Sequence, residues 1–494
     1  MTILLMMSMK LTVKSFFSAL FILGLTFVIS CRQEIQEEET VATEAPITSI
    51  QFDLEGIRER GSLVAILDNS STGYFIYKGQ PMGYEFDLLS LFAKHLDIRL
   101  KIELTTSIDE AFNMLNQGKG DVIAYNLTIT NERKKFVQFS KSHYKTKQVL
   151  IQRKPEGWRK MTREKLNRSL LRDQNDLMGK EVYVRKSSAY VQRLKNLADE
   201  IGGDISVVET EDSLETERLI KMVAEGQIDY TIADESVALV NAAYYSNIDV
   251  YTPISFPQRI AWAVRHTSDS LLKELDSWLT QIKKQPTYNV VYNKYFNSPR
   301  SSMMRASSDF SSISGQKISP YDHLIKAAAD SIGWDWRLLA AQMYQESRFD
   351  PKAKSWAGAV GLMQLVPETG RRFGARVLTD PGQSIKAGTA YIKHLDKLWA
   401  KTISDEGERK KFVLASYNVG LGHVVDARDL AKKYGKSFDV WDDHVEYYLL
   451  NKSNKKYIND PVVKFGYCRG EEPVRYVREI LNRYTQYSQL IASS

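Results

Sequence analysis

The chain has 494 residues, of which 43% are hydrophobic and 26% are charged, a composition typical of a globular protein. This length is too great for one ordinary core, so we expect about two to four domains. The net charge of +7 is small and the Lys and Arg residues are dispersed, which argues against nucleic acid as a partner. Seven scattered histidines and two cysteines indicate neither a metal site nor a disulfide framework, and we expect no cofactor.

Residues 1–31 have the pattern of a lipoprotein signal peptide. A basic start is followed by a short apolar run, and Ser30 stands before Cys31. The run is typical of a signal peptide rather than of a membrane-spanning helix. Residues 28–31 resemble a lipoprotein box, which implies acylation of Cys31, and Arg32 after it favours the periplasmic face of the outer membrane. The alternative is an ordinary buried cysteine beside a non-lipid signal. Residues 32–57, polar and acidic without periodicity, predict a flexible tether.

Residues 58–297 alternate between strand and helix patterns. Short apolar strands are predicted at 63–67, 99–104 and 120–125, and amphipathic helices at 84–96 and 108–115. A second set begins at 180–184 and continues through a helix at 215–223 to a strand at 228–232. Strands separated by helices predict a parallel α/β sheet.

Several motifs in this region carry a family resemblance. Gly83–Leu88, Asn126–Arg133, Phe139-Ser140 and Ala233–Glu235 resemble the amino-acid-binding periplasmic solute-binding proteins. The resemblance implies two α/β lobes joined by crossovers near 149–152 and 260–264. It also implies a cleft at the carboxyl ends of the strands that holds a small amino-acid or muropeptide ligand.

The resemblance further implies which residues line this cleft. Arg133 presents a planar fork suited to a carboxylate, and with Thr128 it would hold the ligand's α-carboxylate, while Asp234 would accept the ammonium group. The remaining implied pocket residues are Asn69, Tyr74, Asn126 and Ser188. Ser187-Ser188 departs from the Gly-Thr of many relatives, and the added β-carbon would narrow the cleft. The alternative is a degenerate regulatory scaffold without a free ligand.

Residues 298–319 are rich in Ser and predict an interdomain linker, easily cut by protease. Helical patterns then dominate residues 320–490. Asp335 is a good N-cap for a helix on which Leu339, Met343 and Glu346 share one face. A carboxyl in line with a core-facing stripe has a raised pKa, as a general acid needs near neutral pH. The alternative is a Glu that snorkels at a helix end.

Four motifs after the linker carry a second resemblance. Glu346-Ser347, Gly361–Gln364, Ala415–Asn418 and Tyr476 resemble the lytic transglycosylases, which have a helix-dominated, lysozyme-like α+β domain. The resemblance implies cleavage of the MurNAc–GlcNAc bond of peptidoglycan, with Glu346 as the single acid and base. It implies substrate contacts by Ser347, Met363, Gln364, Tyr417, Asn418 and Tyr476, although Met363 also suits a core position.

The surroundings of Glu346 offer no convincing second carboxylate. Most glycosidases place two carboxylates across the scissile bond. Asp350 precedes Pro351 and is typical of a turn, and Glu368 follows Pro367 and is typical of a helix start. A one-carboxylate site needs a nucleophile from the substrate, which predicts 1,6-anhydro-MurNAc as product. Two alternatives remain: an amino-acid or muropeptide-binding lipoprotein receptor whose C-terminal domain only binds glycan, and a lysozyme-type hydrolase.

Overall fold

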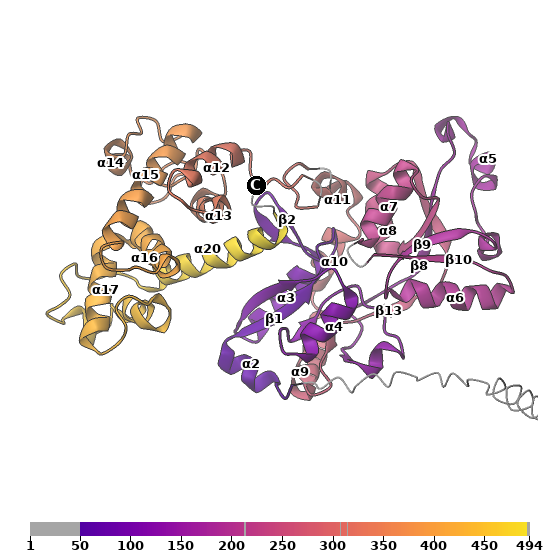
Figure 1. The fold of residues 1–494 in the computed structure, drawn as a ribbon, viewed down its shortest axis with the longest axis horizontal. Coiled ribbons are helices and arrows are strands. Elements are labelled where there is room, and N and C mark those ends of the chain that lie inside the picture. Colours follow the sequence, from indigo (N-terminus) through magenta and orange to yellow (C-terminus); the bar gives the residue numbers. More distant parts are fainter. Residues whose placement is uncertain (1–49, 212–213, 307, 314, 492–494) are drawn as a thin grey trace, which may run out of the picture. The chain divides into compact units, whose positions relative to one another are not determined.

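The computed structural model describes residues 50–211, 214–306, 308–313 and 315–491 (Figure 1). The predicted signal peptide, Cys31 and most of the predicted tether lie outside these residues. The last part of that tether is folded, because Asp53 caps helix α2 (Leu54–Arg60) and also accepts bonds from the backbone of Ser270 and Leu271. In the described part of the chain, no helix is both long and apolar enough to cross a membrane.

The first lobe is built on a five-stranded sheet in the order β4-β1-β5-β14-β6. Strands β1 and β4 pair in parallel, and so do β1 and β5, whereas β14 is antiparallel to both β5 and β6. The sheet is therefore mixed rather than purely parallel, because the chain returns to this lobe to add β14. Its strands are β1 (Ser62–Leu67), β4 (Arg99–Leu104), β5 (Val122–Ile123), β6 (Gln138–Phe139) and β14 (Ala263–Val264).

Helices α3 and α4 occur where the sequence predicts them, and the core between helices and sheet is apolar. The helices of this lobe besides α2 are α3 (Tyr84–His95), α4 (Ile108–Asn116), α9 (Asp269–Ile282) and α10 (Pro286–Tyr295). A hairpin of β2 (Phe75–Tyr77) and β3 (Gln80–Met82) extends from the same lobe.

The second lobe holds another five-stranded sheet, in the order β10-β9-β11-β8-β12. Here β8 pairs antiparallel with both β11 and β12, so this sheet is also mixed. The strands are β8 (Gln148–Arg153), β9 (Glu181–Arg185), β10 (Ser206–Thr210), β11 (Tyr230–Asp234) and β12 (Ile248–Pro253). The helices are α5 (Arg163–Arg168), α6 (Ala189–Ile201), α7 (Thr216–Glu225) and α8 (Glu235–Tyr244).

A two-stranded ribbon of β7 (Tyr144–Thr146) and β13 (Gln258–Ile260) carries the chain between the lobes. The predicted crossovers are displaced by a few residues, because 149–152 already belong to the second sheet and 263–264 to the first.

Residues from about 320 onward form a helical domain, and its described residues contain no strand. Of the β structure expected for an α+β domain, they contain only the isolated bridges Lys354–Val360 and Val360–Leu365. Its helices are α12 (Asp322–Asp330), α13 (Trp336–Ser347), α14 (Pro367–Arg372), α15 (Pro381–Trp399), α16 (Glu406–Val419), α17 (Leu421–Lys433), α18 (Glu446–Asn451), α19 (Lys455–Ile458) and α20 (Glu471–Leu490), with a π-helical turn at Trp441–Val445. Figure 1 shows α20 as one long helix that runs beside α13 and α16, with which it is in contact.

The segment predicted as a Ser-rich linker has regular structure. Residues 299–306 form helix α11 (Pro299–Ala306), which packs on α8 of the second lobe. Further on, Phe310 accepts a hydrogen bond from Lys78 N, and Ser312 N donates one to Ile76. The sequence pattern of this linker therefore did not predict helix α11 or the backbone bonds that tie Phe310 and Ser312 to the hairpin.

Candidate active site and ligand pocket

A groove of about 770 Å³ lies between α13, the end of α16, the start of α20 and the loop before α14. Glu346 lines it from the last turn of α13. Helix α13 begins where Asp335 accepts a hydrogen bond from Arg337 N at 2.8 Å, as the sequence predicts. Leu339 and Met343, on the face that also carries Glu346, are fully buried.

The carboxyl group of Glu346 is in an environment that disfavours its charge. Burial raises the pKa of Glu346 to about 8, although a hydrogen bond from the Tyr476 hydroxyl group opposes this shift. Tyr476, 5% exposed, itself accepts a bond from Gln342 Nε2 at 3.3 Å. The chain of Gln342, Tyr476 and Glu346 thus sets the orientation of the carboxyl group, while burial keeps this group largely protonated at neutral pH.

Tyr417, Asn418 and Gln364 line the same groove. Tyr417 donates its hydroxyl hydrogen to Met363 O at 2.7 Å, which joins α16 to the loop after α13. That loop depends on Gly361, which has φ +83°, and a Cβ there would stand 1.9 Å from Leu378 O. Only glycine therefore allows the backbone of this loop to approach Leu378 so closely.

Two of the residues predicted to contact substrate do not line the groove. Ser347 is buried, donates its hydroxyl hydrogen to Met343 O and Leu362 O, and does not line the groove. Met363 is fully buried, and its side chain packs where a Cβ on Gly388 would lie. Both residues are one position from a groove residue, Glu346 or Gln364, and therefore point to a different side of the chain.

The groove also contains residues that sequence reasoning missed. Trp356, fully exposed, and Tyr467, 60% exposed, present aromatic surface at its walls. Glu472 is a second carboxyl group in the groove, exposed at the start of α20. No periodic pattern marks these three residues, although exposed aromatic residues in loops are a signal for carbohydrate contact. Among the described residues, no group of three or more His, Cys, Asp or Glu side chains is arranged to hold a metal ion.

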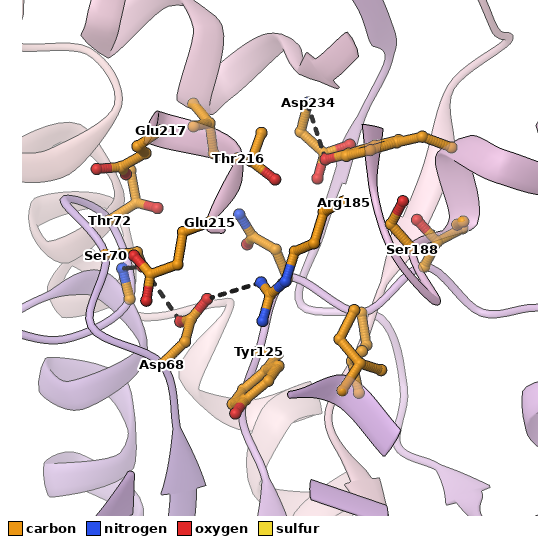
Figure 2. Close-up of a pocket in the computed structure, with 18 of the residues that line it drawn as sticks. Asp68, Ser70, Thr72, Tyr125, Arg185, Ser188, Glu215, Thr216, Glu217 and Asp234 are labelled. Carbon is orange, nitrogen blue, oxygen red and sulfur yellow. Dashed lines mark hydrogen bonds and ion pairs between the residues drawn. The ribbon is translucent and has the colours of Figure 1, made fainter. Parts of the chain in front are cut away.

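A second cavity, of about 70 Å³, lies between the two lobes (Figure 2). It is formed at the carboxyl ends of strands, as predicted, because Asp68 follows β1, Arg185 ends β9 and Asp234 ends β11. The predicted residues Asn126, Thr128, Arg133, Ser188 and Asp234 all line it.

Arg133 is 8% exposed and donates hydrogen bonds to Thr128 O at 3.1 Å and to Ser187 O of the other lobe at 3.2 Å. A guanidinium group has five N–H donors, so donors remain for a ligand carboxylate. Asp234 is 1% exposed, and its Oδ1 has no hydrogen-bond partner. Burial raises the pKa of Asp234 to about 7, while Tyr190 and Arg133 oppose the shift.

Two predicted pocket residues do not line the cavity. Tyr74 is fully buried and packs against Phe86 with ring centroids 5.3 Å apart. Asn69 accepts a bond from Ser312 at 3.4 Å, whereas its neighbours Asp68 and Ser70 face the cavity. The sequence prediction chose the wrong alternate residues of an extended segment. It also missed Arg185, Glu215 and Glu217, which belong to segments far apart in the chain.

The comparisons with known proteins agree with this division. Residues 63–298 match the family model of bacterial extracellular solute-binding proteins, family 3, and residues 323–440 match the transglycosylase SLT domain. An ancestral arginine-binding protein of known structure is 25% identical, with a TM-score of 0.40, and the match covers 48% of this chain and 99% of that one. The fold and the two sites thus define a two-module protein, in which a solute-binding module precedes a helical transglycosylase domain.

Two curated relatives extend over nearly the whole chain. The membrane-bound lytic murein transglycosylase F of Desulfosudis oleivorans is 37% identical over 87% of this chain and 90% of that protein. That of Pseudomonas fluorescens is 34% identical over 87% of this chain and 85% of the relative. The chain belongs to the family of membrane-bound lytic murein transglycosylase F.

Proposed function

We propose that this protein is a peptidoglycan lytic transglycosylase. It cleaves the β-1,4 bond between MurNAc and GlcNAc, leaves 1,6-anhydro-MurNAc ends, and is regulated by a ligand in its solute-binding module. The observation that carries the proposal is the position of Glu346, whose carboxyl group lines an open groove, accepts a hydrogen bond from Tyr476 and has a pKa that burial raises to about 8. Such a carboxyl group is mostly protonated at neutral pH and can serve as a general acid.

In the first step, Glu346 donates its proton to the glycosidic oxygen that leaves C1 of MurNAc. Positive charge then develops at C1, and the 2-acetamido group of the same sugar can stabilise it. Asn418, exposed in the groove, is the candidate that orients this acetamido group. Ser347 is not, because its hydroxyl group bonds to Leu362 O at 2.8 Å.

In the second step, the Glu346 carboxylate accepts the proton of the MurNAc 6-hydroxyl group while that oxygen bonds to C1. The carboxyl group is thereby restored, and the product is a 1,6-anhydro ring. The hydrogen bond from Tyr476 favours the carboxylate that exists between the two steps. Tyr417 and Gln364 shape the groove so that the 6-hydroxyl group, rather than water, reaches C1.

The released sugar tests this mechanism directly. Digestion of purified peptidoglycan should give MurNAc ends that lack one water relative to a hydrolysed end, and mass spectrometry distinguishes the two. Glu346→Gln should reduce the rate about 10²–10⁴-fold with glycan binding retained. Glu472→Gln is the matched control and should keep most of the activity. Hydrolysed ends, together with loss of activity in both variants, would identify a two-carboxylate hydrolase instead.

In the solute-binding module, we propose that Arg133 and Thr128 bind the α-carboxylate of an amino acid or muropeptide and that Asp234 accepts its ammonium group. The unpartnered Oδ1 of Asp234 supports this assignment. Ligand should raise the melting temperature of the full chain by mass action. Arg133→Ala should remove the shift, and the neighbouring exposed Lys134→Ala should keep it. No shift with any amino acid or stem-peptide fragment would favour a scaffold without a ligand.

The two relatives named above are called membrane-bound, and we propose that this chain is attached through acylated Cys31 at the periplasmic face of the outer membrane. Acyl chains supply the membrane affinity in this arrangement. Cys31→Ser should therefore give an uncleaved or soluble protein. If the variant is cleaved to its mature length and still sediments with membranes after a high-salt wash, the lipid assignment is wrong.

A further inference from the structure

The cavity between the lobes has two ends of different chemistry. Figure 2 shows Asp68, Glu215 and Glu217 on one side of Arg185, and Asp234 and Ser188 on the other. Arg133 lies close enough to Asp234 for the charge of each group to shift the pKa of the other. One end therefore pairs a guanidinium with a carboxyl group, and the other end, which we call the acidic end, combines three carboxyl groups with the guanidinium of Arg185.

The carboxyl groups of the acidic end are unequally satisfied. Glu217 accepts bonds from Ser71 N at 2.9 Å and Ser71 Oγ at 2.6 Å, across the two lobes. Asp68 lies 3.6 Å from Arg185 and accepts a bond from Ser70 at 3.2 Å. Glu215 also lines the cavity, but no hydrogen bond or ion pair to its carboxyl group is present within the described ranges.

Arg185 cannot balance all three carboxyl groups. It is 7% exposed, and its guanidinium also donates to Thr106 O. Burial, followed by the nearby charges of Asp68 and Glu217, raises the pKa of Glu215 to about 8. A positive charge placed beside Glu215 would relieve this repulsion.

Independent features at the opposite end indicate that the cavity is built for a ligand. Asp234 Oδ1 and Ser188 Oγ are both buried and unpartnered, and both residues line the cavity. Buried polar atoms are normally hydrogen-bonded, so unpartnered ones around a cavity point to a missing polar molecule. A zwitterionic group would satisfy that end, since its carboxylate would meet Arg133 and its ammonium would meet Asp234.

We propose that the solute-binding module takes an α-amino acid whose side chain carries a second positive charge, with Glu215 as the residue that receives this charge. This inference rests on the amino-acid binding proposed above and names the class of ligand. A neutral side chain would leave the acidic end without a cation, and an acidic one would add a fourth negative group there. The cationic side chain alone offers Glu215 the charged partner that the protein does not provide.

Pairs of amino acids that match in shape but differ in charge test the proposal. Isothermal titration of the full chain would compare L-arginine with L-citrulline, and L-lysine with L-norleucine. We expect each cationic member to bind roughly tenfold or more tightly than its neutral counterpart, as one charge-assisted hydrogen bond implies. This comparison uses the wild-type protein and needs no variant to fold.

A variant then assigns the preference to one residue. Glu215→Gln should reduce the preference for the cationic member to less than about threefold and leave the affinity for citrulline and norleucine unchanged. Glu225→Gln, at the exposed end of the same helix α7, is the control and should keep the full preference.

The outcomes separate this inference from the proposal on which it rests. Equal binding of cationic and neutral members would overturn the inference and leave amino-acid binding intact. Absence of binding by all four amino acids would overturn both. A preference that survives in Glu215→Gln would refute the role of Glu215.

Discussion

Replacing Glu346 by Gln should stabilise the transglycosylase domain at neutral pH while it removes the proposed chemistry. In the folded protein burial raises the pKa of Glu346 from 4.5 to about 8. In the unfolded chain the group regains its ordinary value. Between pH 4.5 and pH 8 the unfolded state therefore releases a proton that the folded state keeps, so the free energy of unfolding falls as pH rises.

The magnitude follows from the two pKa values. One pKa unit corresponds to about 1.36 kcal/mol, so the wild-type protein loses about 3 kcal/mol between pH 4.5 and pH 7 because of this group. Gln cannot ionise and escapes the loss. For a domain of this size the difference corresponds to a rise of roughly 6–12 °C in melting temperature at pH 7. Below pH 4 the ionisation of Glu346 should no longer separate the two proteins.

Calorimetric melting of both proteins from pH 4 to pH 8.5 is the assay. The difference between the two curves, rather than either curve alone, isolates the ionisation, since packing and hydrogen bonding of the Gln amide contribute at every pH. Glu406→Gln, at an exposed position in α16, is the control for removing a carboxyl group that does not line the groove. Parallel curves for wild type and Glu346→Gln would show that Glu346 ionises normally, and the general-acid argument would fail.

Three further outcomes are expected. The wild-type kcat/KM should hold up to about pH 8 and fall above it, as Glu346 loses its proton; a decline centred near pH 5 would contradict this assignment. Tyr476→Phe removes the hydroxyl donor to Glu346, so activity should fall about 10- to 100-fold. The alkaline limb of the pH–activity profile should also move to higher pH, whereas Tyr484→Phe on the same helix should leave that limb in place. Gly79→Ala should lower stability by about 1–3 kcal/mol in chemical denaturation, because the new Cβ would come within 3 Å of the rings of Phe349 and Tyr344 and of the hydroxyl oxygen of Tyr487. Gly157→Ala has a similar φ but open space, and an equal loss there would refute the steric explanation.

Much of the fold could be predicted because local patterns are strong. The period of α13, its cap at Asp335 and the buried stripe that includes Leu339 predict both the helix and the raised pKa of Glu346. The mixed sheets were not predictable in this way. Strand direction depends on where the chain re-enters a lobe, and the residue pattern of β14 does not indicate whether this strand is parallel or antiparallel to its neighbours.

The pocket residues show where sequence patterns stop being informative. In an extended segment adjacent side chains point in opposite directions, so an error of one residue exchanges Asp68 for Asn69. Arg185 and Glu215 meet Asp68 only through the packing of two lobes, and nothing local to either residue predicts the contact.

The β2–β3 hairpin is held from two directions. Ile76 and Lys78 bond to the backbone of residues 310–312, and Gly79 O accepts a bond from Tyr487 at 2.6 Å. Residues 310–312 and the last turns of α20 therefore both form hydrogen bonds with the hairpin. A backbone break just before Phe310 should leave the molecule in one piece, in contrast to the two separate pieces that a flexible linker predicts. Nicked enzyme would elute as an intact particle from a native sizing column and separate into two bands only on a denaturing gel.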